Sequence, residues 1–224
     1  MNKPTLIYCY DAYCGWCYGF SPVIRKIAEQ YKNEFYIEVL SGGMMVGKDV
    51  MPIEKIGPLL QNSYQKTEEL TGVKFGTDYL WHINNPDKSD WVMNSEKPAI
   101  ALCVFKEYCP DDAILFATDI QYALNEEGRD LDDDEAYRHL LEKYKIPEIE
   151  FYAKLKSEEF KEKAYYEFEW CKHLQVNEFP QVLVQQNETK YRLLAKGFTD
   201  YETINARIIE VLTELKNTPE QGEF

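Results

Sequence analysis

The chain has 224 residues, of which 45% are hydrophobic, so it can bury a sizeable core and is not expected to be disordered. Its formal net charge of −14 argues against sequence-independent binding to nucleic acid or to an anionic membrane surface, because both need a basic face. No apolar run is long enough to cross a bilayer, and the first residues lack the apolar stretch and cleavage site of a signal peptide, so we expect a cytoplasmic protein.

The first part of the chain predicts a strand, a helix and a second strand. Thr5–Tyr10 is a short run rich in strand formers. Apolar residues then recur at helical spacing from Cys14 to about Tyr31, with Pro22 inside this helix. Tyr36–Leu40 predicts the second strand. A strand–helix–strand unit implies parallel strands joined by a right-handed crossover.

The middle of the chain, from about residue 50 to residue 174, contains almost nothing strand-like and predicts a helical block. The acidic excess is spread over such segments, for example residues 130–135, where we expect a solvated helix start. Helical periodicity and start signals predict four helices here: Pro98–Tyr108, Asp111 or Asp112 to about Asn125, Glu135–Tyr144, and about Ser157–Leu174.

The end of the chain returns to mixed structure. Val182–Gln185 and Tyr191–Ala195 predict two short strands, which the polar residues 186–189 join as a hairpin. Thr199 and Glu202 have the spacing of a capping box and predict the start of a closing helix.

The whole pattern predicts an α/β fold in the order β-α-β, then helices, then β-β-α. One sheet is expected from both ends of the chain, with a large all-helical domain inserted between them. We place the sheet-forming domain at residues 1–45 and 175–218, and the inserted helical domain at residues 46–174.

The pair Cys14 and Cys17 carries the clearest chemical signal, because the C-x-x-C motif follows a strand directly and opens a helix. A helix N-terminus presents unpaired N–H groups and a partial positive charge, which stabilise the nucleophilic thiolate. Cys17 lies one helical turn later, so its sulfur can reach that of Cys14. We expect Cys14 to attack a disulfide and Cys17 to resolve the mixed disulfide, with the oxidising direction running the same steps backwards.

Two other interpretations apply to such a pair. A zinc site needs four ligands, and no second C-x-x-C or H-x-x-x-H accompanies this one, so we predict no metal. Two buried structural cysteines fit poorly with the strand-to-helix corner, which we expect to be exposed. Of the other cysteines, Cys9 and Cys171 are expected to be small buried hydrophobes, whereas Cys109 is the best candidate for a further exposed thiol.

Phe179 and Pro180 give the second signal, because they precede the hairpin directly. Proline is tolerated at the first position of a strand. A cis Phe179–Pro180 bond would hold the backbone of Phe179 near the cysteines, where it could pair with an extended substrate segment. An ordinary trans bond is the alternative, and the residues alone leave both open.

The segment from Tyr10 to Pro22 resembles the active-site segment of the DsbA-like family, in its cytosolic branch of predicted protein disulfide isomerases related to the FrnE-like proteins. The resemblance implies a thioredoxin fold with an inserted helical domain, Cys14 as nucleophile, Cys17 as resolving thiol and Pro180 in cis. It continues over nearly the whole chain, at Gly42-Gly43, Asn94–Pro98, Gly128–Asp130 and Phe179-Pro180.

One departure from the family pattern lies beside this proline. The family usually has a glycine before the Phe-Pro pair and a threonine after it, whereas this chain has Glu178 and Gln181. We expect the two polar side chains to change the polarity of the substrate groove.

The sequence therefore predicts a thiol–disulfide oxidoreductase of the protein disulfide isomerase type, acting on disulfide- or thiol-bearing proteins. No cofactor is expected beyond the redox-active cysteine pair, with glutathione as a candidate reductant. Two alternatives stay open: a non-catalytic adaptor or redox sensor that binds a protein partner, and a glutathione-dependent small-molecule isomerase or transferase. The predicted site consists of two catalytic residues and four residues around the substrate, namely Cys14, Cys17, Gly15, Trp16, Phe179 and Pro180.

Overall fold

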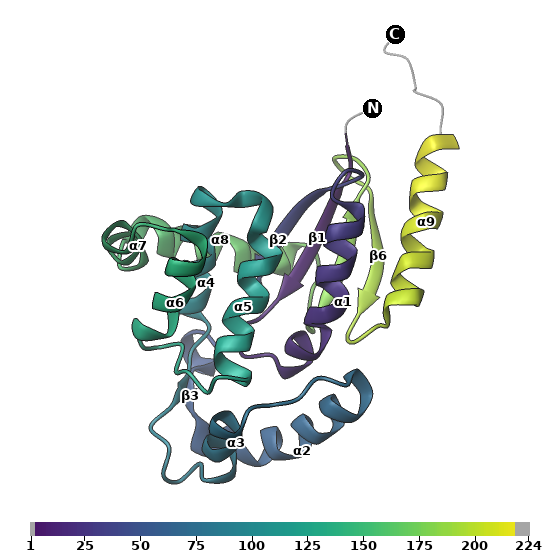
Figure 1. Ribbon diagram of the computed structural model, residues 1–224. Helices are drawn as coiled ribbons and strands as arrows, with labels where there is room; N and C mark the ends of the chain where they lie inside the picture. The colour runs from purple at the N-terminus through teal and green to yellow at the C-terminus, as the bar shows by residue number, and fades with distance from the viewer. Residues whose placement is uncertain (1–2, 218–224) are drawn as a thin grey trace.

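The computed structural model describes residues 3–217 and builds a four-stranded sheet from both ends of the chain (Figure 1). The central strand β1 (Thr5–Tyr10) pairs in parallel with β2 (Tyr36–Ser41) and antiparallel with β5 (Gln181–Gln185). The last strand, β6 (Tyr191–Lys196), pairs antiparallel with β5 at the edge. The predicted parallel unit, the hairpin and the fold class are confirmed.

The side chains of β1 alternate between two apolar clusters, as the two-residue repeat of a strand requires. Tyr8 and Tyr10 belong to the large core, together with the apolar face of α1 (Gly15–Tyr31). Cys9 faces the opposite side of the sheet, where it packs in a small cluster with Cys171. The sheet is therefore covered on both faces, which explains why β1 is buried from Leu6 to Tyr10.

The middle of the chain contains the four predicted helices and three that the sequence analysis did not predict. Two two-residue strands, β3 (Met51–Pro52) and β4 (Val92–Met93), form a small antiparallel pair. The last helix of the described residues is α9 (Tyr201–Asn217). The confirmed helices are α4 (Glu96–Tyr108), α5 (Ala113–Asn125), α6 (Glu135–Tyr144) and α8 (Glu158–His173), and the additional ones are α2 (Ile53–Thr71), α3 (Thr77–Asn84) and α7 (Glu148–Leu155).

Helix α2 has an apolar repeat at helical spacing, but Gly57 and Pro58, which ordinarily interrupt helices, lie near its start. Its buried positions are Ile53, Gly57 and Thr67. A Cβ atom added to Gly19 of α1 would lie 2.8 Å from the methyl group of Thr67, so the two helices approach closely at this glycine. Ile56, Leu60 and Tyr64 continue the apolar repeat of α2 and pack against the main core, so the helix was missed because of its glycine and proline and not for want of an apolar face.

The predicted start of the closing helix is wrong by one residue. Asp200 is the capping residue, since its side chain accepts hydrogen bonds from the N–H of Thr203 (2.9 Å) and from the Thr203 hydroxyl (2.8 Å). The hydroxyl of Thr199 donates instead to the carbonyl of Gly197 (3.4 Å). A carboxylate at this position competes successfully with the neighbouring hydroxyl for the free N–H groups.

The helical segment and the sheet share one buried core, because α5 packs along α1 and α8 packs on β2. The division into a domain at 1–45 and 175–218 and an insert at 46–174 stays a prediction, and residues 1, 2 and 218 lie outside the described residues.

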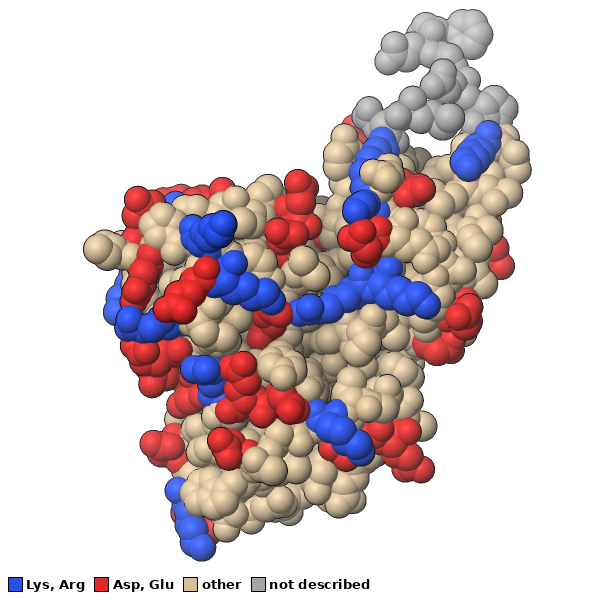
Figure 2. All heavy atoms as spheres, viewed as in Figure 1, with Lys and Arg blue, Asp and Glu red and all other residues tan. Residues whose placement is uncertain are grey.

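In Figure 2 acidic side chains are spread over the visible face with basic ones among them. Within residues 3–217 no helix has both the length and the apolar character that a membrane crossing needs.

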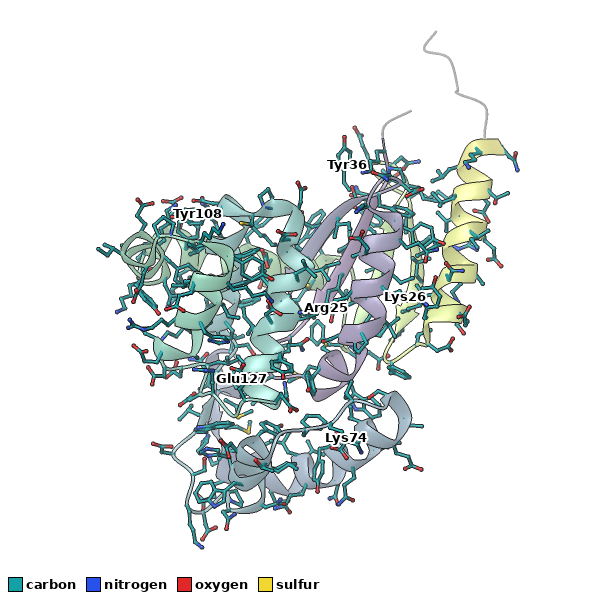
Figure 3. The ribbon with its side chains drawn as sticks, in the orientation of Figure 1. Arg25, Lys26, Tyr36, Lys74, Tyr108 and Glu127 are labelled. Carbon is teal, nitrogen blue, oxygen red and sulfur yellow. The ribbon has the colours of Figure 1, made fainter. Side chains whose placement is uncertain are left out.

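A cluster of charges joins α1 to α5. Arg25 extends from α1 toward α5 (Figure 3) and donates to the carboxylate of Asp119 at 2.5 Å. The same carboxylate, 8% exposed as a residue, also accepts from Lys143 (2.5 Å) and Tyr144 (2.7 Å). Burial alone would raise the pKa of Asp119, but these three donors hold it below its ordinary value.

We expect Asp119→Asn to lower the free energy of unfolding at pH 7 by about 1–3 kcal/mol, because Arg25 and Lys143 lose their anionic partner. The folded-state pKa of Asp119 lies below its unfolded value. The contribution is therefore present above a pH of about 4 and is lost as the pH falls through the folded-state value. Urea denaturation at several pH values measures it, with the exposed Asp87→Asn as control. A destabilisation that does not shrink in acid would contradict this account.

Candidate active site

The chain turns sharply between β1 and α1, and the turn carries Cys14. The Cys14 N–H donates to the carbonyl of Asp11 (3.1 Å), which closes the turn. The Cys14 carbonyl accepts the N–H of Tyr18 (3.1 Å), which makes Cys14 the N-cap of the helix. Cys14 therefore sits where unpaired backbone N–H groups and the positive end of the helix dipole meet.

The structure brings Cys14 next to Phe179, although 165 positions separate them in the sequence. The Cys14 thiol donates to the carbonyl oxygen of Phe179 with an Sγ···O distance of 3.6 Å. The Phe179–Pro180 peptide bond is cis, as the family resemblance implies. Both predicted signals thus meet at one place, together with Gly15 and Trp16, which are half-buried.

Both motif cysteines are buried, so the expectation of an exposed strand-to-helix corner is wrong, and the two differ mainly in their surroundings. Cys14 is 7% exposed and Cys17 is 0% exposed, and all six cysteines of the chain are free thiols. Burial raises the pKa of Cys17 well above its ordinary value, and the neighbouring Cys14 raises it further. Tyr8 lies beside the pair, and its pKa is raised by burial and then by Cys17 and Cys14. Cys17 is therefore kept as a protonated thiol behind Cys14.

Helix α3 and the loop before it cover the other side of the motif. Phe75 lies over Gly15, where an added Cβ would be 3.5 Å from its ring. Tyr79 is buried, and burial followed by the nearby Cys14 raises its pKa. These rings shield the start of α1 from solvent and leave Gly15 and Trp16 as the half-buried residues of the motif.

Asp11 is a buried carboxylate that the sequence analysis did not single out. It is 1% exposed and accepts from the N–H of Tyr13 (3.0 Å), the N–H of Met44 (2.7 Å) and the hydroxyl of Ser95 (2.9 Å). Burial raises its pKa, and these donors partly offset the increase. The signal in the sequence is an acidic residue directly after a buried strand, which needs donors that only the fold supplies.

The loop after β2 fits closely around Phe179. A Cβ atom on Gly42 would lie 1.9 Å from the Phe179 ring, so this close approach requires a glycine. Gly43 has a φ of +65° and would place a Cβ 2.7 Å from the ring of Phe168. The loop therefore serves the structure by holding Phe179 in place, and it also borders the predicted groove.

The two departures from the family pattern point in different directions. Glu178 is exposed and lies 3.7 Å from the ammonium of Lys196. Gln181 is 5% exposed, so its side chain turns into the protein. Gln181 is therefore too buried to change the polarity of an exposed groove, whereas for Glu178 the expectation stays a prediction.

A cleft of about 740 Å³ opens beside α1, lined in part by Tyr18, Arg25, Lys74 and Glu127 (Figure 3). Neither motif cysteine lines it.

Among residues 3–217 no group of three or more His, Cys, Asp or Glu side chains is arranged to hold a metal ion.

Residues 8–206 match the family model described as thioredoxin. Comparison with curated protein sequences finds no match. A candidate protein disulfide isomerase from Nitrosomonas europaea has a similar structure, with a TM-score of 0.82, 22% identity, and coverage of 95% of this chain and 99% of that chain. The cytosolic disulfide reductase DsbM from Pseudomonas aeruginosa gives a TM-score of 0.75 and 22% identity, covering 96% of this chain and 100% of that chain.

The same reductase has also been solved with GSH, and that structure gives a TM-score of 0.72 and 24% identity, covering 93% of this chain and 99% of that chain. A third similar structure, 2-hydroxychromene-2-carboxylate isomerase, gives a TM-score of 0.57 and 12% identity, covering 95% of this chain and 94% of that chain. At these identities the likeness concerns the fold, which agrees with the strand order described above.

We expect iodoacetamide at pH 7.5 to modify Cys14 and the half-exposed Cys109 in the folded protein while Cys17 stays unmodified. The reason is that Cys17 is buried and its pKa is raised, so little thiolate is available to react. Peptide mass spectrometry after quenching measures each site, and denatured protein, in which all six thiols react, is the control. Modification of Cys17 as fast as Cys109 would contradict the arrangement.

Proposed function

The chain belongs to the thioredoxin family, and from this premise we propose that it is a thiol–disulfide oxidoreductase that exchanges disulfides with protein substrates through Cys14 and Cys17. The observation that carries the proposal is the contact between the Cys14 thiol and the Phe179 carbonyl beside the cis Phe179–Pro180 bond. Cys14 is also the N-cap of α1, and in this proposal the Phe179 backbone beside it pairs with an extended substrate segment.

In the first step the thiolate of Cys14 attacks one sulfur of a substrate disulfide. A new S–S bond forms between Cys14 and that sulfur, the substrate S–S bond breaks, and the other substrate sulfur leaves as a thiolate that takes up a proton. The helix N-terminus favours the attacking thiolate. The Phe179 carbonyl, an acceptor for the Cys14 thiol at 3.6 Å, lies where it can accept from the substrate once that thiol proton is gone.

In the second step Cys17 loses its proton and attacks the sulfur of Cys14 in the mixed disulfide. The Cys14–Cys17 bond forms, and the substrate leaves as its second thiol, so two electrons pass to the substrate and the cysteine pair is oxidised. Because Cys17 is 0% exposed, Cys14 is the sulfur within its reach, one helical turn away. Burial of Cys17 thus restricts its role to resolving the intermediate.

The proposed partners are disulfide- or thiol-bearing proteins, and no resident cofactor is proposed. Glutathione is the proposed reductant that returns the pair to the dithiol form, and the similar fold of a reductase solved with GSH supports this choice. A cytoplasmic setting is part of the proposal, since a glutathione pool there keeps thiols reduced. The net charge of −14 favours substrates with basic segments.

We expect Cys17→Ser to form a mixed disulfide with insulin whose disulfide bonds are intact, because the intermediate on Cys14 can no longer be resolved. Non-reducing electrophoresis detects the adduct, which dithiothreitol releases, and mass spectrometry locates it. Cys14→Ser is the matched control and should form no such adduct, although Cys109 is still present in it. An equal yield from both variants would contradict the assignment of Cys14 as nucleophile.

The same cysteine variants also separate this function from the two alternatives, when partner binding and turnover of glutathione conjugates are measured as well. An adaptor would retain a protein partner when both cysteines are replaced by serine, and it would form no adduct. A glutathione-dependent isomerase would turn over small glutathione conjugates with Cys17→Ser unimpaired. The likeness to 2-hydroxychromene-2-carboxylate isomerase is the observation behind this second outcome.

A further inference from the structure

A buried amide from the helical segment contacts the turn that carries Cys14. Gln121 lies on α5 and is 0% exposed. Its Nε2 donates to the carbonyl oxygen of Asp11 at 3.1 Å and to that of Cys14 at 3.4 Å. These two carbonyls are the ends of the turn, so one side chain fixes both the entry to and the exit from it.

The other end of the same amide is engaged through Ser21. The Ser21 hydroxyl lies 3.3 Å from Oε1 of Gln121 and 3.2 Å from the carbonyl oxygen of Cys17, so a single hydroxyl links the amide to the second cysteine. Ser21 is 8% exposed, and it lies one helical turn beyond Cys17. Gln121 and Ser21 together therefore contact the backbone of both motif cysteines from inside the protein.

We propose that Gln121 is a positioning residue that sets the redox equilibrium of the Cys14–Cys17 pair, an inference that rests on the proposed oxidoreductase function. Its N–H groups place partial positive charge beside the backbone of Cys14 in a water-free setting, where hydrogen bonds and dipoles act strongly. They also hold the turn so that the thiolate of Cys14 stays at the N-terminus of α1. Both effects stabilise the reduced form, which makes the pair more oxidising.

A purely structural role for the same residue makes a different prediction. A buried amide whose donors and acceptor are all satisfied stabilises the fold, and its loss lowers the melting temperature without changing the equilibrium between dithiol and disulfide. The redox equilibrium is therefore the readout that distinguishes positioning from stability alone.

The test compares Gln121→Met, which keeps the size but removes the amide, with Ser21→Ala, which removes only the bridging hydroxyl. For each variant, the fraction of Cys14–Cys17 disulfide is measured at fixed ratios of reduced to oxidised glutathione. We expect the equilibrium constant for oxidation of the Cys14–Cys17 pair by glutathione disulfide to rise about two- to tenfold in Gln121→Met, which corresponds to the free energy of one hydrogen bond. The rise should be smaller in Ser21→Ala. The alkylation rate of Cys14 at pH 7 should fall in the same order.

Thr118→Val is the matched control, because Thr118 is also a buried polar residue of α5 but bonds to Arg25 instead of the turn. It should lower stability and leave the redox equilibrium unchanged. If Gln121→Met does not fold, Ser21→Ala carries the test. A wild-type equilibrium in both Gln121→Met and Ser21→Ala, or an equal shift in Thr118→Val, would overturn the inference. Failure of the wild-type protein to equilibrate with glutathione would instead count against the proposed function.

Discussion

The contact between the Cys14 thiol and the Phe179 carbonyl is the interaction on which the rest of the site depends. It exists because β1 and β5 are neighbours in the sheet, with Cys9 opposite Gln181 in their antiparallel register. The turn that follows β1 and the cis Phe179–Pro180 segment that precedes β5 therefore meet at the same edge. The thiol of Cys14, near one end of the chain, thereby gains a hydrogen-bond acceptor from near the other end.

The helical segment acts as the support of this edge. Three of its helices reach the turn or the strand ends through buried polar groups: Ser95 before α4 donates to Asp11, Gln121 on α5 bonds to the turn, and Glu167 on α8 accepts the N–H of Ser41 at 2.8 Å. Each bond satisfies a backbone or carboxylate group that would otherwise be buried without a partner. The turn that carries the motif is thus held by several buried hydrogen bonds from the helical segment.

Local signals in the sequence were sufficient for the elements that build the sheet and for the helices with an apolar face. The positions of Cys14, Cys17 and Phe179-Pro180 followed from the same signals together with the family resemblance. Contacts between distant residues could not be predicted, because Ser95 and Gln121 lie 84 and 110 positions from Asp11. Helix α2 was missed although it has an apolar face, because Gly57 and Pro58 near its start are residues that ordinarily interrupt a helix. The inward turn of Gln181 depends on the surrounding core.

The account claims that Cys14 and Cys17 form one working redox pair, and an equilibrium titration of the purified protein against glutathione tests this claim most directly. We expect a single reversible two-electron transition that is absent in Cys14→Ser, and its midpoint tells whether the pair favours reduction or oxidation of its substrates. Two thiols that stay free over the whole accessible range would contradict the account, and the function would then have to lie in partner binding.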